Sequence, residues 1–403
     1  MKKVLLVQPS LQPPGGANGV AAWIIEALKQ EHAVSVLTWT PVEPAPINRY
    51  YGTLLRASEF TVYGVHPIVR WLIDCVPGPI GKLKTSLLLR LCKRNKDDYD
   101  VIITANNEAD FGRRGIQYIH FPWGYQPHPN ADPRWHHFSP LLINAYAHLW
   151  RRISRFSVEG MKQNLTLVNS DWTGTKVREC HGIKTTTLYP PVPGLFPEVP
   201  WEDRENGFVC IGRIVPEKGL EEVIDILTAV RLRGWDIHLH IVGSADDRRY
   251  YKRILRRVQE NASWVFLEQD LSREELVRLV SMHRYGIHGM AEEHFGIAVA
   301  ELVWAGCLVF VPRGGGQVEI VDGDERLLYG AAEEAAAKIT LVMSDPDAQR
   351  SLRTHLASRK ELFSTGRFMR RIQEVVRQFG ETPRGALVSQ PTAVARDEPP
   401  GRI

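Results

Sequence analysis

The chain has 403 residues, of which 44% are hydrophobic, and its formal net charge is +4 at pH 7. This length predicts two to three domains with sizeable cores, and so mild a charge argues against nucleic acid as the main partner. Five scattered cysteines without a C-x-x-C pair indicate neither a disulfide framework nor a zinc site. The start shows no signal-peptide cleavage site, and no apolar window of about 18 residues predicts a membrane span. We expect a cytoplasmic α/β protein.

The first segment is typical of a Rossmann-like unit. Val4 to Val7 is an apolar strand, a loop rich in proline and glycine covers residues 13–19, and a helix is expected from about Val20 to Lys29. The loop lacks the G-x-G-x-x-G pattern, and no acidic residue follows the next strand to hold a dinucleotide ribose, which argues against NAD. On the residues alone, Gly15 and Gly16 fit either a tight turn or a close approach to a ligand.

Three further strands are expected in this half of the chain, over Asp100–Thr104, Ile116–Phe121 and Leu165–Ser170. His120 stands at the end of the second, where open α/β sheets bind their ligands. A lone histidine in such a place is also often structural.

A proline-rich run after residue 190 is stiff and marks a domain boundary. We predict an N-terminal domain over residues 1–190, a linker over 191–204 and a C-terminal domain over 205–365. A last helix over 366–379 and a disordered tail over 380–403, which is rich in proline, glycine, threonine and arginine, are expected to follow.

The second domain opens with a strand, Phe208 to Ile211, and the turn GRIVPEKG over residues 212–219. Arg213 and Lys218 bracket this strand-to-helix turn, so that both cations can converge on a diphosphate. Taken alone, the pair also fits two solvated surface cations.

A strand, loop, helix and strand are expected over residues 285–311, with the helix between Gly296 and Gly306. Free amides at the helix start form an anion site suited to a phosphate; they belong to Phe295, Gly296 and Ile297. Glu301 lies about 7 Å further along the helix, where a ribose attached to that phosphate would present its diol. Glu293, in the loop before the helix, would face the group on the distal phosphate. Without further context, both glutamates fit an ordinary surface.

Taken together, these motifs resemble one family. Two glutamates separated by seven residues, E-H-F-G-I at 293–297 and the glycines of residues 314–316 with Glu319 are similar to the retaining glycosyltransferases of family 4. NSDWT at 169–173 and YPPV at 189–192 match the same family in order and position. The resemblance implies the GT-B fold, in which two Rossmann-like domains face each other across a cleft.

What the resemblance implies is transfer of a sugar from a nucleoside diphosphate sugar to a hydroxyl. His120 would face the donor sugar, with Glu293 as its catalytic partner, and the loop at Gly15 and Gly16 would approach the donor. Arg213, Lys218 and the amides at 295–297 would bind the diphosphate without a metal or other cofactor, and Glu301 would bind the ribose. Retention is expected by attack on the face that the diphosphate leaves. The D-x-D patterns at 322–324 and 345–347 sit at turns, and we predict no metal there.

The H-F-G-I variant looks most like the subgroup of a GDP-mannose-dependent α-1,2-mannosyltransferase that extends lipid-linked oligosaccharide. Mannose is therefore the expected hexose, GDP-mannose or a UDP-sugar the donor, and a glycan or lipid-linked glycan the acceptor. A soluble small acceptor remains an alternative, as does a non-catalytic protein that binds nucleotide sugars. Two stretches that mix apolar and basic residues, 66–96 and 141–162, fit either ordinary surface helices or contact with an anionic membrane. The second reading implies a peripheral location on the inner face of a membrane.

Overall fold

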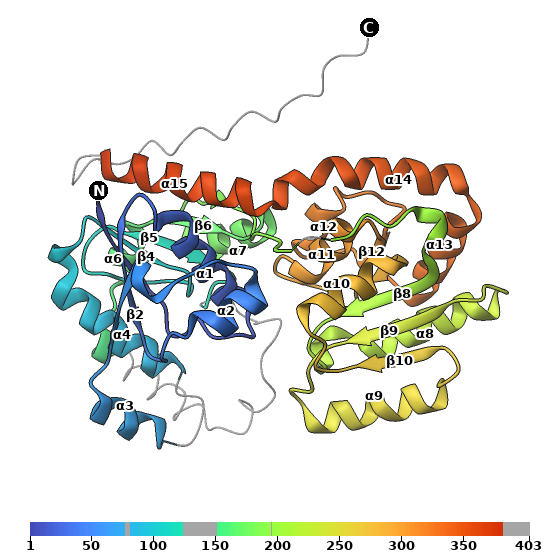
Figure 1. Ribbon diagram of the computed structural model, residues 1–403, viewed down its shortest axis with the longest axis horizontal. Helices are drawn as coiled ribbons and strands as arrows, with labels where there is room; N and C mark the ends of the chain where they lie inside the picture. Colours follow the sequence, from blue (N-terminus) through green and yellow to red (C-terminus); the bar gives the residue numbers. More distant parts are fainter. Residues whose placement is uncertain (77–80, 124–150, 195, 382–403) are drawn as a thin grey trace, which may run out of the picture.

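A computed structural model of the chain describes residues 1–76, 81–123, 151–194 and 196–381. Figure 1 shows two lobes, each built on a sheet with helices packed around it. The N-terminal sheet has seven strands in the order β3-β2-β1-β4-β5-β6-β7, and the C-terminal sheet has six in the order β10-β9-β8-β11-β12-β13. Neighbouring strands run parallel in both sheets. The expected pair of Rossmann-like domains is confirmed.

Apolar runs form the strands of the N-terminal sheet, and its central strands are the most buried. Its strands are β1 (Lys3–Val7), β2 (Ala33–Thr38), β3 (Phe60–Gly64), β4 (Val101–Thr104), β5 (Ile116–Ile119), β6 (Leu165–Val168) and β7 (Thr186–Thr187). The surrounding helices are α1 (Gly16–Leu28), α2 (Pro44–Tyr51), α3 (Pro67–Asp74), α4 (Gly81–Asn95), α6 (Val158–Lys162) and α7 (Asp171–His181). The first helix begins at Gly16 rather than near Val20, because Gly15, at φ 148°, makes the turn by itself.

The C-terminal sheet follows the same plan. Its strands are β8 (Glu205–Ile211), β9 (His238–Val242), β10 (Val265–Glu268), β11 (His283–Ile287), β12 (Leu308–Pro312) and β13 (Leu328–Tyr329). Its helices are α8 (Leu220–Leu232), α9 (Arg248–Glu260), α10 (Arg273–Met282), α11 (Ile297–Ala305), α12 (Gln317–Ile320), α13 (Ala332–Ser344) and α14 (Pro346–Arg359). Within the described ranges, every helix is too short or too polar to cross a bilayer.

The last helix, α15 (Thr365–Glu381), does not extend the C-terminal domain. It crosses back and lies along the N-terminal lobe, at the top of Figure 1. The apolar face of α15 joins the N-terminal core; this face consists of Phe368, Ile372, Val375, Val376 and Phe379. Where the chain crosses, the Val192 amide of the linker donates to the Phe363 carbonyl at 2.9 Å. The linker and the segment before α15, which both cross between the domains, are therefore joined by a hydrogen bond. The tail expected to be disordered lies outside the described residues from 382 onward.

The two D-x-D patterns lie at a turn, residues 322–324, and at the start of α14, residues 345–347. Asp345 caps α14 by accepting from the amides of Asp347 and Ala348, and Asp324 pairs with Arg326. The five cysteines, all in the described ranges, are free thiols.

A carboxylate joins the two domains directly. Glu319, from α12, accepts hydrogen bonds from the amides of Asp171 and Trp172 at the start of α7, at 2.9 and 2.8 Å. The Tyr189 hydroxyl donates to the same carboxylate at 3.0 Å. Nearby, the Ser170 hydroxyl donates to the His294 carbonyl at 2.6 Å. A negative charge on free helix amides is favourable, so Glu319 acts as an N-terminal cap supplied by the other domain.

We predict that Glu319→Ala lowers the stability of the full chain by about 1–3 kcal/mol, because two helix amides and a tyrosine hydroxyl lose their shared acceptor. The midpoint of urea-induced unfolding measures this change. Glu260→Ala, at an exposed helix end, is the control and should leave the midpoint unchanged. If the two variants unfold at the same urea concentration, the proposed role of the interdomain cap is wrong.

Candidate active site

Two backbone turns meet at the carboxyl ends of β8 and β11. Gly219 ends the 3-10 turn Pro216–Lys218 at φ 59°, and a Cβ added there would lie 2.7 Å from the Gly289 carbonyl oxygen. A Cβ on Gly289 would in turn lie 2.6 Å from the Lys218 carbonyl oxygen. Only glycine allows this approach, which brings the turn after β8 against the loop after β11.

Lys218 and Glu293 form an ion pair at this junction. Their side chains are only 15% and 16% exposed. The Glu293 carboxylate also contacts His288 Nε2 at 3.2 Å and accepts from the His294 amide at 3.2 Å. Burial alone would raise the pKa of Glu293, but the Lys218 ammonium and the His288 contact outweigh burial and hold this pKa well below its usual range. Glu293 is therefore a carboxylate at neutral pH.

The glycine turn over residues 314–316 supports Glu293 from behind. The Gly316 amide donates to the Glu293 carbonyl at 2.7 Å. Gly315, at φ 74°, has no room for a Cβ, which would lie 2.3 Å from the same carbonyl oxygen. The backbone at Glu293 is thus fixed on one side by β12 and its turn, and its side chain on the other by Lys218.

Helix α11 starts beside this ion pair and faces the N-terminal domain. Gly296 precedes it in a left-handed conformation, and Phe295 is buried. A Cβ on Gly16 would lie 3.1 Å from Ile297 Cδ1, so the N-terminal glycine loop and the start of α11 lie against each other. The sequence predicted both as ligand-binding elements, and the structure brings them together.

Glu301 is buried on α11 and binds Arg273, a residue that sequence analysis did not single out. Arg273 Nη1 donates to Glu301 Oε1 at 2.5 Å, and Nη2 donates to the Pro193 carbonyl at 2.5 Å. The ring of Phe196 lies 5.6 Å from the guanidinium carbon. Arg273 belongs to α10 and Pro193 to the linker, so this contact could be found only from the tertiary structure. Glu301 is held in place by a cation on another helix.

His120 follows β5 directly, as predicted. Its Nε2 is 3.0 Å from the Ala105 carbonyl oxygen, which can only accept, so Nε2 carries the proton and Nδ1 is left as an acceptor. Burial lowers the pKa of His120 to about 4, so its imidazole is neutral at pH 7. The neighbouring Phe121 ring stacks on His294, with 4.3 Å between ring centroids. This contact ties the strand-end segment of the N-terminal domain to the loop that carries Glu293.

Arg213 and Lys218 do not converge in the way the sequence predicted. The Arg213 side chain is 61% exposed and pairs with Asp246 at 3.4 Å. Lys218 turns inward to Glu293. The two cations flank the same turn but have different carboxylate partners.

Comparison with known proteins gives a family for the second domain. The family "Glycosyl transferases group 1" matches residues 194–359. The chain is 26% identical over 200 residues to a GDP-Man:Man(3)GlcNAc(2)-PP-Dol alpha-1,2-mannosyltransferase of Dictyostelium discoideum, and the match covers 44% of this chain and 38% of that protein. It is 24% identical over 219 residues to the human alpha-1,3/1,6-mannosyltransferase ALG2, covering 46% and 52% respectively. The chain thus spans about half or less of these relatives.

Solved structures extend the similarity to both domains. The Anabaena protein Alr3699/HepE, crystallised with UDP and glucose, superposes with a TM-score of 0.65 over 94% of this chain and 100% of that chain, at 17% identity. WaaG, a glycosyltransferase involved in lipopolysaccharide biosynthesis, gives 0.63 over 93% and 99%, at 14% identity. Residues 194–359 therefore form a glycosyl transferases group 1 domain, within a chain that has the GT-B fold as a whole.

Proposed function

We propose that the protein transfers a hexose, with mannose as the expected sugar, from a nucleoside diphosphate sugar to a hydroxyl of a glycan or lipid-linked glycan. The observation that carries this proposal is the group formed by Lys218, ionised Glu293 and the start of α11, which lies against Gly16 of the opposite domain. The similarity to mannosyltransferases supports the sugar, and the UDP and glucose in the HepE structure support a nucleotide sugar as donor.

In this proposal the diphosphate lies between cations and helix amides. Lys218 and the amides at 295–297 would bind it, with exposed Arg213 closing over it from the rim. Glu301, fixed by Arg273, would accept from the two ribose hydroxyls. The glycine loop at Gly15–Gly16 would cover the donor from the N-terminal domain.

Charge development governs the proposed reaction. The departing diphosphate gains negative charge, which Lys218 and the amide dipoles of α11 stabilise without a metal ion. Glu293 is already ionised, so it can stabilise positive charge on the sugar carbon as the bond to the diphosphate breaks. Neutral His120 offers Nδ1 as an acceptor for a sugar hydroxyl. The acceptor hydroxyl would attack from the face that the diphosphate leaves, passing its proton to the departing oxygen, so the anomeric configuration would be retained.

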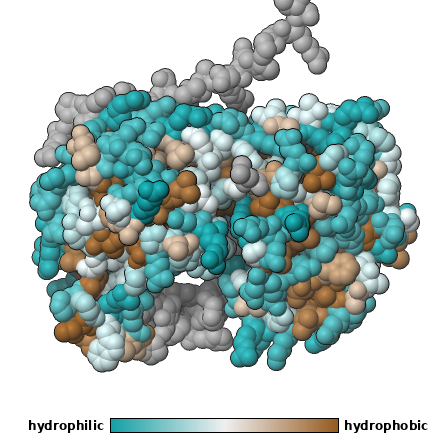
Figure 2. All heavy atoms as spheres, in the orientation of Figure 1, coloured by the Kyte–Doolittle hydropathy of each residue, from teal (hydrophilic) through white to brown (hydrophobic). Residues whose placement is uncertain are grey.

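The apolar face of α3 supports a lipid-linked acceptor at a membrane. Its exposed side chains include Ile68 at 62%, Trp71 at 65% and Leu72 at 54%. Asp74, at the end of α3, contacts Lys84 Nζ at 2.7 Å and Trp39 Nε1 at 2.9 Å, which fixes the helix with these side chains outward. Figure 2 shows the resulting hydrophobic atoms at the lower left, where Figure 1 draws α3.

Basic residues accompany this apolar face. Arg70 lies within α3, 3.7 Å from Asp74, and Lys84 of α4 contacts the same carboxylate. Such a combination suits an anionic bilayer surface. Residues 141–150 of the second basic-apolar stretch lie outside the described residues.

Donor binding is tested first, by thermal shift with UDP, GDP, ADP and their sugars in the presence of EDTA. We expect one nucleotide and its sugar to raise the melting temperature of the wild type, because a ligand that binds only the folded state stabilises it. Glu301→Ala should abolish most of this shift, while exposed Glu292→Ala should keep it. An absence of any shift in the wild type would contradict nucleotide-sugar binding, and a shift that needs added metal would contradict metal independence.

Turnover tests Glu293 once the donor is known. We expect Glu293→Gln to lower kcat for release of the nucleoside diphosphate by about 10²- to 10³-fold, because the developing positive charge loses its carboxylate. Glu292→Gln, one residue away and exposed, is the matched control and should turn over like the wild type. Equal rates for both variants would remove Glu293 from the mechanism. NMR of the product reports its anomeric configuration, and inversion would contradict the same-face route.

Membrane contact is tested by flotation of the full chain with vesicles of phosphatidylcholine and phosphatidylglycerol. We expect the double variant Trp71→Ser, Leu72→Ser to bind at least about tenfold more weakly, since two apolar side chains no longer enter the interface. The double variant Leu232→Ser, Leu341→Ser removes exposed leucines of the C-terminal domain and should bind like the wild type. If the wild type stays unbound, or if both variants bind equally, the lipid surface is not the partner of α3.

A further inference from the structure

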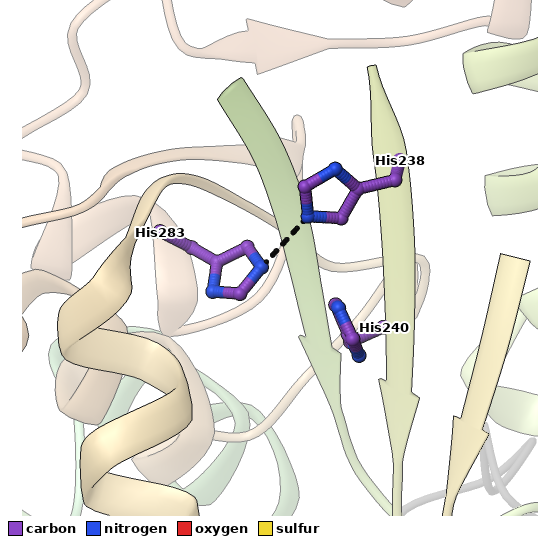
Figure 3. A group of neighbouring side chains, drawn as sticks. All are labelled: His238, His240 and His283. Atoms are coloured by element: carbon purple, nitrogen blue, oxygen red, sulfur yellow. Dashed lines mark hydrogen bonds between the residues drawn. The ribbon is translucent and has the colours of Figure 1, made fainter. Parts of the chain in front are cut away.

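Three histidines lie close together at the amino ends of the strands of the C-terminal sheet, on the side opposite the candidate active site. His238 and His240 lie two residues apart on β9, so both side chains project from the same face. His283 begins β11. His238 Nε2 and His283 Nε2 are 2.9 Å apart, and one ring nitrogen from each of the three residues lies within 4.8 Å of the others. Figure 3 shows the three side chains, with a dashed line between His238 and His283. No step of the proposed reaction uses them.

A glycine on the strand between them makes this contact possible. β8 separates β9 from β11, so the two histidine-bearing strands are about 10 Å apart. Gly207 of β8 is paired with His238, and a Cβ added to Gly207 would lie 2.2 Å from His238 Nε2. Any other residue would occupy the space in which the imidazoles meet.

A carboxylate lies beside two of these imidazoles. Glu205, the first residue of β8, places Oε2 3.4 Å from His238 Nε2 and 3.9 Å from His283 Nε2. Ligand atoms bound to one tetrahedral zinc ion are about 3.3 Å apart, given bonds of about 2.0–2.1 Å. The separations among His238, His283 and Glu205, which are 2.9, 3.4 and 3.9 Å, bracket this value. His240 offers a ring nitrogen within 4.8 Å of those of the other two histidines.

Outer hydrogen bonds orient two of the imidazoles. His283 Nδ1 is 2.7 Å from the Leu279 carbonyl oxygen, which only accepts, so the proton is on Nδ1 and Nε2 has a free lone pair. His240 Nδ1 contacts Glu268 Oε1 at 3.0 Å, which leaves Nε2 of His240 for a metal. A carboxylate or carbonyl behind each ligand histidine is the usual support of a zinc site.

We propose that His238, His240, His283 and Glu205 bind one Zn²⁺ ion, which joins β8, β9 and β11 at their amino ends. Three imidazoles and a carboxylate are ligands that zinc accepts in tetrahedral geometry. The donor-binding residues follow the carboxyl ends of β8 and β11, so this ion stabilises the domain and takes no part in glycosyl transfer. The proposal is independent of the proposed function.

The test uses the full chain without an affinity tag, treated with chelator and dialysed. We expect titration calorimetry with ZnCl₂ to give one ion per chain, and zinc to raise the melting temperature. Co²⁺ in its place should give the intense visible absorption of a tetrahedral site. Glu268→Gln should weaken zinc binding by about tenfold, as loss of an outer partner does, and His240→Gln by about 100-fold or more.

Controls separate this site from other histidines. His355→Gln, whose partner is Asp322, should bind zinc like the wild type. Circular dichroism verifies that His240→Gln is folded, and the milder Glu268→Gln provides a second measure if it is not. The proposal is overturned if the wild type binds no zinc at micromolar concentration, or if zinc binding is the same in wild type, Glu268→Gln and a folded His240→Gln.

Discussion

The ion pair of Lys218 and Glu293 is the interaction on which the candidate site depends. It joins the turn after β8 to the loop after β11, and little of either side chain reaches solvent. Removing one partner of a buried pair typically costs about 3–5 kcal/mol, because the remaining charge stays desolvated. The backbone here is held by close contacts, since Gly219, Gly289 and Gly315 allow main-chain atoms to approach where a side chain would prevent it. The two side chains are therefore presented from a closely packed backbone frame.

The position of one domain against the other follows from a second set of contacts around the same loop. His294 supplies a carbonyl to Ser170 and a ring to Phe121, while Glu319 caps α7. Two crossings of the chain, at the linker and before α15, meet at Val192 and Phe363. Residues that belong to the C-terminal motifs thus also contact the N-terminal domain, where Gly16 lies against Ile297. The glutamate proposed for catalysis and the residues that join the two domains are thus neighbours in one short segment.

The two ends of the C-terminal sheet differ in chemistry. At the carboxyl ends of the strands, loops and the start of α11 gather a cation, a carboxylate and backbone amides. At the amino ends, three imidazoles meet over Gly207. Parallel strands present all their carboxyl ends on one side, where variable loops form binding sites, and leave the other side to contacts that stabilise the sheet.

Local patterns in the sequence predicted most of the strands and helix α11, but they did not predict the strands β3 and β13. Apolar runs predicted these strands, and Gly296 and Gly306 marked the two ends of α11. The sequence also predicted that His120 follows a strand and that Glu293 lies in a loop. These features depend on neighbours within a few residues, which the sequence lists directly. The boundary at Gly16 and the length of α15 were less accurate, because helix ends depend on single backbone conformations.

Partners distant in the chain were decided only by the tertiary structure. Lys218 pairs with a glutamate 75 residues away, Glu301 with Arg273 on another helix, and Glu319 with amides 148 and 147 residues away in the other domain. Periodicity and motif spacing carry no information on such pairs, because each depends on how two sheets and their loops stack. The sequence by itself determined two Rossmann-like units and which residues carry charge. Only the fold decided which charges meet, because close backbone approach at glycines brings the loops together.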